Sequence, residues 1–471
     1  MPQVAGVDSS TQSTKVELRD VDTGAVVARA SMPHAQTTPP RSEQDPESWM
    51  MAFDAAWSAV GEPAVAAISV AGQQHGMVAL DAAGAVVRPA KLWNDTESAP
   101  DAGWLLKQLP GGSASWASAC GSVPLAAFTI SKLSWLHRSE PENWARMARI
   151  VLPHDYMTYR LTGAMVTDRG DASGTGYWSP TTGEYCWDLL AIVDRERDWS
   201  QALPRVLGPL EAAGTWRDAI VGPGTGDNMA AALGLALQPG DAVISLGTSG
   251  TVYAVASQPT NDASGAVAGF ADATGRFLPL VCTLNATKVT DTVARLVGVD
   301  LASLDALAAT CPLGADGVTM LPYFDGERTP NLPRATGGLI GLRSDATREQ
   351  LARAAFDGVV CGLLDAFDAL RECVPHIERV VLVGGGSRSS VYRQTVADLC
   401  DLDVFVSDAG EAVAAGACVQ AAAVLEGVDL SVVATRWGLG ERRLISRSSS
   451  VSSDAAADVR AAYAALRDRM A

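Results

Sequence analysis

An aspartate stands among glycines in residues 222–228, which read GPGTGDN. Glycine has no side chain, so the carboxylate of Asp227 is left open to a ligand that approaches closely. Such a carboxylate can accept the proton of an attacking hydroxyl, the part that phosphoryl transfer assigns to a general base. An Asx-type loop turn explains the same pattern about as well. Asp227 is therefore a candidate base with a structural alternative.

Two segments half the chain apart repeat one design. Residues 4–18 and 242–255 each hold an apolar run, a turn of small polar residues and a second apolar run. When the segments are superposed, Thr11 meets Thr248, which stands 237 residues later in a chain of 471. Each copy predicts a β-hairpin whose turn lacks bulky side chains, so that its N–H groups can hold a phosphate. We expect two related α/β lobes that face each other and hold a polyphosphate between their turns.

Only the first copy ends its first strand on a carboxylate, Asp8, where the second copy has Ser245. One carboxylate at a phosphate-binding turn favours Mg²⁺, which typically uses one or two carboxylates together with phosphate oxygens. The alternative is that Asp8 only caps the turn. The repetition of the turn favours the metal role.

Residues 72–76 (GQQHG) follow a predicted strand and gather amide and imidazole groups. Polyol recognition needs many such hydrogen-bonding groups beside an apolar wall, and Trp93, Asn94 and Asp95 stand shortly downstream. A lone histidine is more often structural than functional, so His75 has a second explanation as a core residue.

The common nucleotide and hydrolase motifs are missing from the sequence. None of the five lysines follows a glycine, so there is no Walker A loop. No HRD, DFG, HExxH or GxSxG sequence occurs, which excludes the signatures of protein kinases, zincins and α/β-hydrolases. The glycines 384–386 follow an apolar strand without forming GxGxxG, so a Rossmann site is weakly supported.

The composition disfavours several classes of binding partner and of cellular location. The net charge of −17 disfavours nucleic acid and anionic membranes, and 48% apolar residues suffice for sizeable cores. The eight cysteines form no C-x-x-C pair, and the start MPQVAGVDSS has an acid where a signal peptide needs a basic region. No apolar run makes a good membrane span. We expect a cytoplasmic protein.

Amphipathic spacing predicts helices at 46–60, 348–371 and 455–469, with starts at Asp45 and in 345–347. The sequence QPGD in 237–241 suggests a boundary between lobes at 1–238 and 239–471. A weaker repeat relates residues 67–72 to 380–385, again a strand followed by a glycine-containing turn.

The ordered set of motifs resembles the FGGY carbohydrate kinases, and within them the xylulokinase branch, over almost the full length. The segments that carry the resemblance are 7–15 (VDSSTQSTK), 43–46 (EQDP), 72–76 (GQQHG), 92–95 (LWND), 129–133 (TISKL), 152–156 (LPHDY), 226–228 (GDN), 245–250 (SLGTSG), 321–323 (LPY), 326–330 (GERTP) and 384–388 (GGGSR). GQQHG and EQDP distinguish this branch from glycerol kinases.

The resemblance implies a duplicated actin-like, ribonuclease-H-type α/β fold with a cleft for ATP and sugar between its lobes. It implies that ATP·Mg²⁺ phosphorylates the 5-hydroxyl of D-xylulose to D-xylulose 5-phosphate as the lobes close to exclude water. By this likeness Asp227 is the base and Asp8 helps to place Mg²⁺. The other implied site residues are Gln74, His75, Trp93, Asn94 and Asn228 for the sugar, and Thr11, Gln12, Ser13, Gly247, Thr248, Ser249, Gly385, Gly386, Ser387 and Arg388 for ATP.

Two departures from the family pattern bear on specificity and on the first turn. Most relatives carry an arginine two residues after Trp-Asn-Asp, where this chain has Glu97 after Thr96. The first turn has Ser10 and Gln12 where glycine and Ser/Thr are common.

Three alternatives stay open at this stage. Another pentulose or deoxy-sugar kinase, such as a ribulokinase, fits most of the motifs. An actin-like or chaperone-type ATPase would share the lobes and the phosphate turns, but not GQQHG and GDN. A sugar-sensing repressor fits less well, because of the charge and because nothing before Val4 suggests a DNA-binding segment. The family also suggests a homodimer.

Overall fold

The structure is a computed structural model that describes residues 2–407 and 410–470. The described residues form two units. The first holds residues 2–237, 257–278 and 410–440, and the second holds 238–256, 279–407 and 441–470. The chain first passes from one unit to the other between Leu237 and Gln238.

The strands of the first unit are β1 (Gln3–Ser9), β2 (Ser13–Asp20), β3 (Val26–Pro33), β4 (Glu43–Gln44), β5 (Ala67–Gly72), β6 (Val78–Leu80), β7 (Ala90–Lys91), β8 (Arg149–Val151), β9 (Val166–Asp168), β10 (Trp178–Ser179), β11 (Glu184–Tyr185), β12 (Arg205–Leu207), β13 (Gly214–Trp216), β14 (Ala219–Val221), β15 (Thr225–Gly226) and β18 (Ala268–Ala271). Its helices are α1 (Pro46–Ala59), α2 (Ala99–Gln108), α3 (Ser113–Cys120), α4 (Thr129–Ser139), α5 (Pro141–Arg146), α6 (Pro153–Thr162), α7 (Arg169–Ala172), α8 (Trp187–Val193), α9 (Trp199–Ala202), α10 (Asp227–Gly234), α15 (Ala412–Glu426) and α16 (Leu430–Arg436).

The second unit contains β16 (Asp241–Leu246), β17 (Gly250–Ala254), most of β19 (Phe277–Thr283), β20 (Thr319–Leu321), β21 (Gly338–Ile340), β22 (Arg379–Val383), β23 (Asp403–Val406) and β24 (Arg443–Ile445). Its helices are α11 (Thr287–Val297), α12 (Leu301–Ala309), the 3₁₀ turn η1 (Ala315–Gly317), α13 (Arg348–Cys373), the 3₁₀ turn η2 (Gly385–Arg388), α14 (Ser390–Leu399) and α17 (Ser453–Met470).

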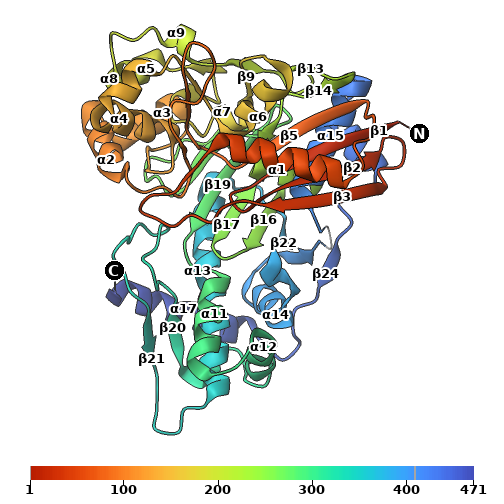
Figure 1. Cartoon of the computed structure of the whole chain (residues 1–471). Helices are drawn as coiled ribbons and strands as arrows, with labels where there is room; N and C mark the ends of the chain where they lie inside the picture. The colour runs from red at the N-terminus through yellow and green to blue at the C-terminus, as the bar shows by residue number, and fades with distance from the viewer. Residues whose placement is uncertain (1, 408–409, 471) are drawn as a thin grey trace. The chain divides into compact units, whose positions relative to one another are not determined.

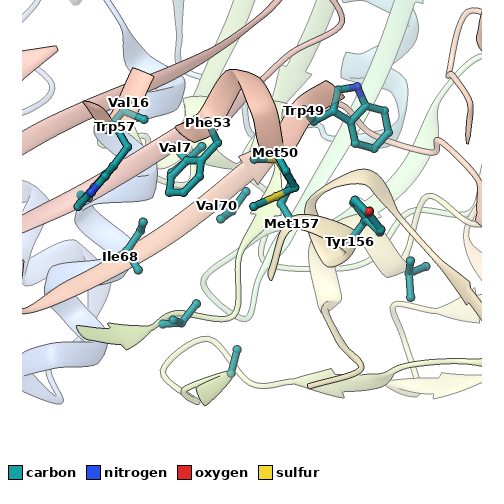
Figure 2. Close-up of a cluster of buried hydrophobic side chains, with 14 of the residues drawn as sticks. Val7, Val16, Trp49, Met50, Phe53, Trp57, Ile68, Val70, Tyr156 and Met157 are labelled. Atoms are coloured by element: carbon teal, nitrogen blue, oxygen red, sulfur yellow. The ribbon is translucent and has the colours of Figure 1, made fainter. Parts of the chain in front are cut away.

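The main sheet of the first unit runs in the order β13-β14-β5-β1-β2-β3, and β15 also pairs with β5 (Figure 1). Helix α1 packs on one face of it, because the residues of β1 alternate in direction and turn Ala5 and Val7 toward the helix. Figure 2 shows Phe53 and Met50 of α1 near Val7 and Val70 of the strands. Burial of such large side chains stabilises the unit by about 1.5–3 kcal/mol each.

Helix α15 packs directly on β1. A Cβ atom on Gly6 would lie 2.2 Å from the carbonyl oxygen of Ala414 and 2.7 Å from the sulfur of Cys418. Ten consecutive α15 residues, 414–423, are buried, as expected of a helix that is apolar all round. The units therefore differ from the continuous lobes 1–238 and 239–471, because α15 and its neighbours complete the first unit rather than the second.

The two main sheets share one topology. In the first, β5 and β1 are parallel and β2 and β3 follow antiparallel. In the second, β22 and β16 are parallel and β17 and β19 follow antiparallel. The predicted hairpins are β1–β2 and β16–β17, and the weaker repeat corresponds to β5 and β22. The prediction of a duplicated α/β fold is thus confirmed.

The predicted helices are also confirmed as α1, α13 and α17. Asp45 caps α1 by accepting a hydrogen bond from the N–H of Glu47, and Thr347 and Gln350 form a capping box at the start of α13. Across 2–407 and 410–470, no single helix is long and apolar enough to cross a membrane. The pair α15 and α16, bent by 115° at its break, passes the same test of length and composition.

Candidate active site

Three strand ends gather the polar residues of the first unit's site. Strands β1 and β15 both pair in parallel with β5, so their carboxyl ends share one edge of the sheet. Asp8 lies at the end of β1, Gln73 and Gln74 follow β5, and Asp227 follows β15. The pairing of these strands brings together residues that are far apart in the sequence. The carboxyl ends of parallel strands are also where open α/β sheets bind their ligands.

Asp227 is the first residue of α10, after the N-cap Gly226. Its carboxylate accepts hydrogen bonds from the backbone N–H and the side-chain amide of Asn228, at 2.8 and 3.0 Å. Burial, aided by the negative charge of Asp8, raises the pKa of Asp227 to about 7, although the Asn228 hydrogen bonds act in the opposite direction. A carboxylate with this pKa is matched to proton abstraction near neutral pH.

Helix α10 is held against α15 by two glycines. A Cβ on Gly234 would lie 1.9 Å from the carbonyl oxygen of Ala412, and one on Gly416 would lie 1.8 Å from that of Ala230. The two backbones therefore touch, and this contact sets the position of the helix that begins with Asp227.

Asp8 is 4% exposed and pairs with Lys15, whose Nζ lies 3.3 Å from Oδ2. Lys15 also pairs with Glu411 at 2.7 Å. Burial raises the pKa of Asp8, and Lys15 opposes that shift. The other oxygen, Oδ1, is buried and has no hydrogen-bond partner in the described chain.

Side-chain amides connect Asp227 to the predicted sugar-binding residues. The side-chain nitrogen of Asn228 donates to the oxygen of Gln74 at 2.7 Å. The nitrogens of Gln73 and Gln74 and the oxygen of Asn94 are buried and lack hydrogen-bond partners within residues 2–407 and 410–470. Buried amides without partners are costly, so these atoms are suited to a ligand that carries several hydroxyl groups.

Thr11 connects the first turn to Trp93. Its hydroxyl accepts a hydrogen bond from the indole N–H of Trp93 and donates one to the oxygen of Gln73, both at 3.0 Å. Gln44 donates to the carbonyl oxygen of Thr11 at 2.9 Å, while Trp49 holds the Gln44 side-chain oxygen at 2.8 Å. The hydroxyl of Thr11 thus orients an aromatic side chain, a role that the sequence analysis did not foresee.

The first turn partly satisfies its own donors. The backbone N–H groups of Gln12 and Ser13 each approach the hydroxyl of Ser10 at 3.3 Å. The Ser10 hydroxyl in turn donates to the carbonyl oxygen of Ser13 at 3.1 Å. Serine at position 10 therefore closes the turn by a side-chain contact where glycine would leave the N–H groups open.

His75 lies in an aromatic wall next to Gln74. Its ring centroid is 5.2 Å from that of Phe128 and 5.1 Å from that of Phe270, and its backbone φ is +63°. A Cβ on Gly174 would lie 2.1 Å from the ring, so this glycine leaves room for it. The backbone N–H of His75 donates to Asp171 at 3.3 Å.

Two of the predicted ATP motifs meet in the second unit. Strands β16 and β22 are parallel, with Ser245 opposite Val383, so the turn 247–249 and the segment 384–388 leave the same edge of the sheet. A Cβ on Gly386 would lie 2.8 Å from Leu246 and 2.8 Å from Thr287 at the start of α11.

The start of α11 supports the turn 247–249. The N–H of Thr287 donates to the carbonyl oxygen of Gly247 at 3.0 Å, and that of Ala286 donates to Thr248 at 3.3 Å. Within 384–388, the hydroxyl of Ser387 donates to Gly384 at 2.7 Å, and a Cβ on Gly385 would meet no atom within 4 Å. Thr248 and Arg388 are exposed.

Glu97, the departure from the family pattern, belongs to a charge network. It accepts hydrogen bonds from Arg41 at 3.0 to 3.3 Å and from Lys91 at 2.7 Å. Lys91 is fully buried and also pairs with Asp95 at 2.9 Å and Glu43 at 3.1 Å. Glu97 therefore pairs with two cations, and its charge is compensated within the first unit.

The contacts of Gln44 and Gln73 and the environment of His154 were not predicted from the sequence. Gln44 lies in the EQDP motif and Gln73 in GQQHG, so those motifs were the available signal. No sequence pattern pointed to a functional role for His154. Its neighbours Asp155, Asp168 and Asp171 are distributed over a segment that carried no recognised motif beyond LPHDY.

The profile of the N-terminal domain of the FGGY family of carbohydrate kinases matches residues 3–234, and that of the C-terminal domain matches 242–425. The chain belongs to the FGGY family of carbohydrate kinases. This FGGY kinase is 49% identical over 448 residues to the xylulose kinase of Streptomyces coelicolor, an alignment that covers 93% of this chain and 91% of the relative. The xylulose kinase of Escherichia coli is 36% identical over 442 residues, covering 89% of this chain and 90% of the relative.

Solved structures agree with this assignment. The crystal structure of xylulose kinase from Bifidobacterium adolescentis matches with a TM-score of 0.85 and 38% identity over 99% of both chains. A kinase from Brucella ovis, described as a xyloylose kinase, matches with a TM-score of 0.92 and 30% identity over 99% of both chains. Membership of the family makes ATP and a small-molecule sugar the substrates of this FGGY kinase.

Proposed function

We propose that this FGGY kinase transfers the γ-phosphoryl group of ATP to the 5-hydroxyl of D-xylulose and forms D-xylulose 5-phosphate. The observation that carries the choice of sugar is the 49% identity, over 93% of the chain, to a protein named xylulose kinase. The buried amides of Gln73, Gln74 and Asn94, which lack partners in the described chain, support a substrate with several hydroxyl groups.

In this proposal Asp227 is the general base. It removes the proton of the 5-hydroxyl as the oxygen attacks phosphorus, a role worth about 10²–10⁴-fold in rate. The pKa of about 7 supports the role, because the carboxylate is then ionised in much of the population at neutral pH and still binds a proton well. Asn228 holds the carboxylate and Gln74 together, while His75 and Trp93 line the sugar.

The carboxylate near the end of β1 fits a divalent cation. The buried Oδ1 of Asp8, which accepts no hydrogen bond within the described residues, is a hard oxygen ligand of the kind that Mg²⁺ prefers. When bound, Mg²⁺ would neutralise charge on the phosphate oxygens. We assign the phosphates to the turns 11–13 and 247–249 and the adenosine to 385–388. We further propose that the protein is cytoplasmic and acts as a homodimer.

The second candidate is phosphorylation of another pentulose, such as ribulose. Glu97 favours this candidate, since the resemblance to the family predicts an arginine where this chain has a carboxylate. The pairing of Glu97 with Arg41 and Lys91 weakens this alternative, because the negative charge of Glu97 is compensated locally.

A panel of ketoses and polyols with coupled detection of ADP tests the proposal. We expect the highest kcat/KM with D-xylulose and ADP release that depends strictly on added sugar. Higher kcat/KM for ribulose, or ADP release without sugar, would contradict it. Asp227→Asn should lower kcat by at least about 10²-fold, whereas the exposed control Asp218→Asn should retain wild-type activity.

A further inference from the structure

His154 packs against both strand ends that carry the sugar site. A Cβ on Gly72 would lie 2.9 Å from the Cβ of His154, and one on Gly224 would lie 2.6 Å from its Nδ1. Gly72 ends β5, two residues before Gln74, and Gly224 precedes β15 and Asp227. Gly72 therefore lies against the Cβ and backbone of His154, and Gly224 lies against its imidazole ring, so that both strand ends pack on one residue.

Three carboxylates surround the same ring. Nε2 of His154 lies 3.2 Å from Asp155, 3.3 Å from Asp168 and 3.6 Å from Asp171. His154, Asp155 and Asp171 are fully buried and Asp168 is 3% exposed. Buried carboxylates need a compensating charge, and the imidazole is the partner placed to supply it.

The titration of the cluster agrees with this arrangement. The three carboxylates overcome the effect of burial and raise the pKa of His154 to about 9, so the ring is a cation at neutral pH. Burial raises the pKa of Asp171 and of Asp155, and the negative charge of Asp168 acts in the same direction. The single cation of His154 opposes this shift without cancelling it.

The cluster has one hydrogen bond toward each half of the sugar site. Asp171 accepts a hydrogen bond from the backbone N–H of His75 at 3.3 Å, and the same oxygen, Oδ1, lies 3.9 Å from Nδ1 of the His75 ring. Asp168 accepts the hydroxyl of Thr225 at 2.7 Å, two residues before Asp227. Asp168 also caps α7 by accepting the N–H groups of Gly170 and Asp171.

We propose that His154 is a positioning residue of the sugar site. Through Asp171 it orients His75, and through Asp168 and Thr225 it fixes the strand end that presents Asp227. The inference rests on the proposed function, because it assigns a role toward the sugar that this function supplies. Displacement of a reacting group by about 1 Å can cost 10²-fold in rate, so a support of this kind has a measurable effect on catalysis.

Four variants separate the two connections from the charge itself. His154→Gln removes the cation, and His154→Lys restores a cation of similar reach. Thr225→Val removes the hydrogen bond to Asp168 without a change of charge, and Asp171→Asn changes the group that holds His75 and removes one of the three negative charges that face His154. His137→Gln is the matched control, because His137 is exposed on α4.

The readout is the separation of KM from kcat for D-xylulose, with KM for ATP measured in parallel. We expect Asp171→Asn to raise the KM for the sugar about fivefold with a small change in kcat, and Thr225→Val to lower kcat about tenfold with a small change in KM. His154→Gln should do both, His154→Lys should recover most of the loss, and the KM for ATP should stay within about twofold throughout.

Thr225→Val and Asp171→Asn keep the inference testable if His154→Gln does not fold. A purely structural cluster would lower Tm in these variants and leave the KM for the sugar and kcat of the folded protein at their wild-type values, which would overturn the inference. A wild-type protein that phosphorylates no sugar in the panel would overturn the proposed function instead, and the inference with it. An active wild type with unaltered variants would overturn the inference alone.

Discussion

The side-chain amide of Asn228 donates a hydrogen bond of 2.7 Å to Gln74. The same nitrogen lies 3.0 Å from the carboxylate of Asp227, so one amide group joins the proposed base to a proposed sugar contact. The two residues that it joins stand 153 positions apart in the chain, at the ends of the paired strands β5 and β15. Orientation of the base and recognition of the substrate thus depend on one side chain.

The substitution Asn228→Asp should shift the pH dependence of kcat/KM. A new carboxylate beside Asp227 disfavours its ionisation, so the acid limb should move upward from about 7 by about one pH unit. Asn228→Ser loses the amide donor without adding charge and should give a smaller shift in the same direction. The pH–rate profiles of the three proteins check the order, and coincident profiles would contradict it.

The substitution Asp227→Asn, which should lower kcat by at least about 10²-fold, should also stabilise the protein at alkaline pH. The folded-state pKa of about 7 is above the ordinary carboxyl value of 3.8, so the stability tied to this carboxyl is fully present below about pH 4 and is lost as pH rises through 7. Asparagine avoids this loss and should increase the free energy of unfolding at pH 8 by up to about 4 kcal/mol. Urea unfolding at pH 4 and pH 8 measures the difference. A gain of equal size at both values would show that the carboxyl is not the cause.

The substitution Thr11→Val should weaken sugar binding through Trp93. Loss of the hydroxyl leaves the indole N–H and the Gln73 oxygen without their partner, at a cost of about 0.5–1.5 kcal/mol for each hydrogen bond. The KM for D-xylulose should rise about three- to tenfold, while Thr11→Ser, which keeps the hydroxyl, should behave as wild type. Steady-state kinetics decide this, and an equal loss in the serine variant would assign the effect to the turn's shape.

The stability of the first unit should fall on the alkaline side because of His154. Its folded pKa of about 9 exceeds the ordinary imidazole value of 6.5, so its contribution is fully present below pH 6.5 and is lost as pH rises through 9. The charged and titratable groups that face it, Asp155, Asp168 and Asp171, have the opposite sign. In His154→Lys the decline should begin at higher pH, because lysine titrates near 10.4. Denaturant unfolding from pH 6 to 10 tests this, with His137→Gln as the control.

Much of the fold followed from local patterns. The alternation and length of apolar runs predicted the hairpins β1–β2 and β16–β17, and the helical spacing predicted α1, α13 and α17 within about two residues. The assignment of α15 to the first unit did not follow. A helix that is apolar on all sides has no single apolar face from which its packing partner can be predicted. The close contacts of Gly6 and Gly416 show where it packs.

The amino-acid sequence by itself determined the duplicated design, the family and the residue types at the strand ends, because these depend on short motifs and their order. Tertiary structure decided which groups touch. Asn228 meets Gln74, Thr11 holds Trp93, and a histidine with no motif-based role lies among three acids, since hydrogen bonding and charge compensation act between segments that chain position does not relate. Burial likewise decided the pKa of Asp227, for the cost of desolvation depends on neighbours that no local pattern specifies.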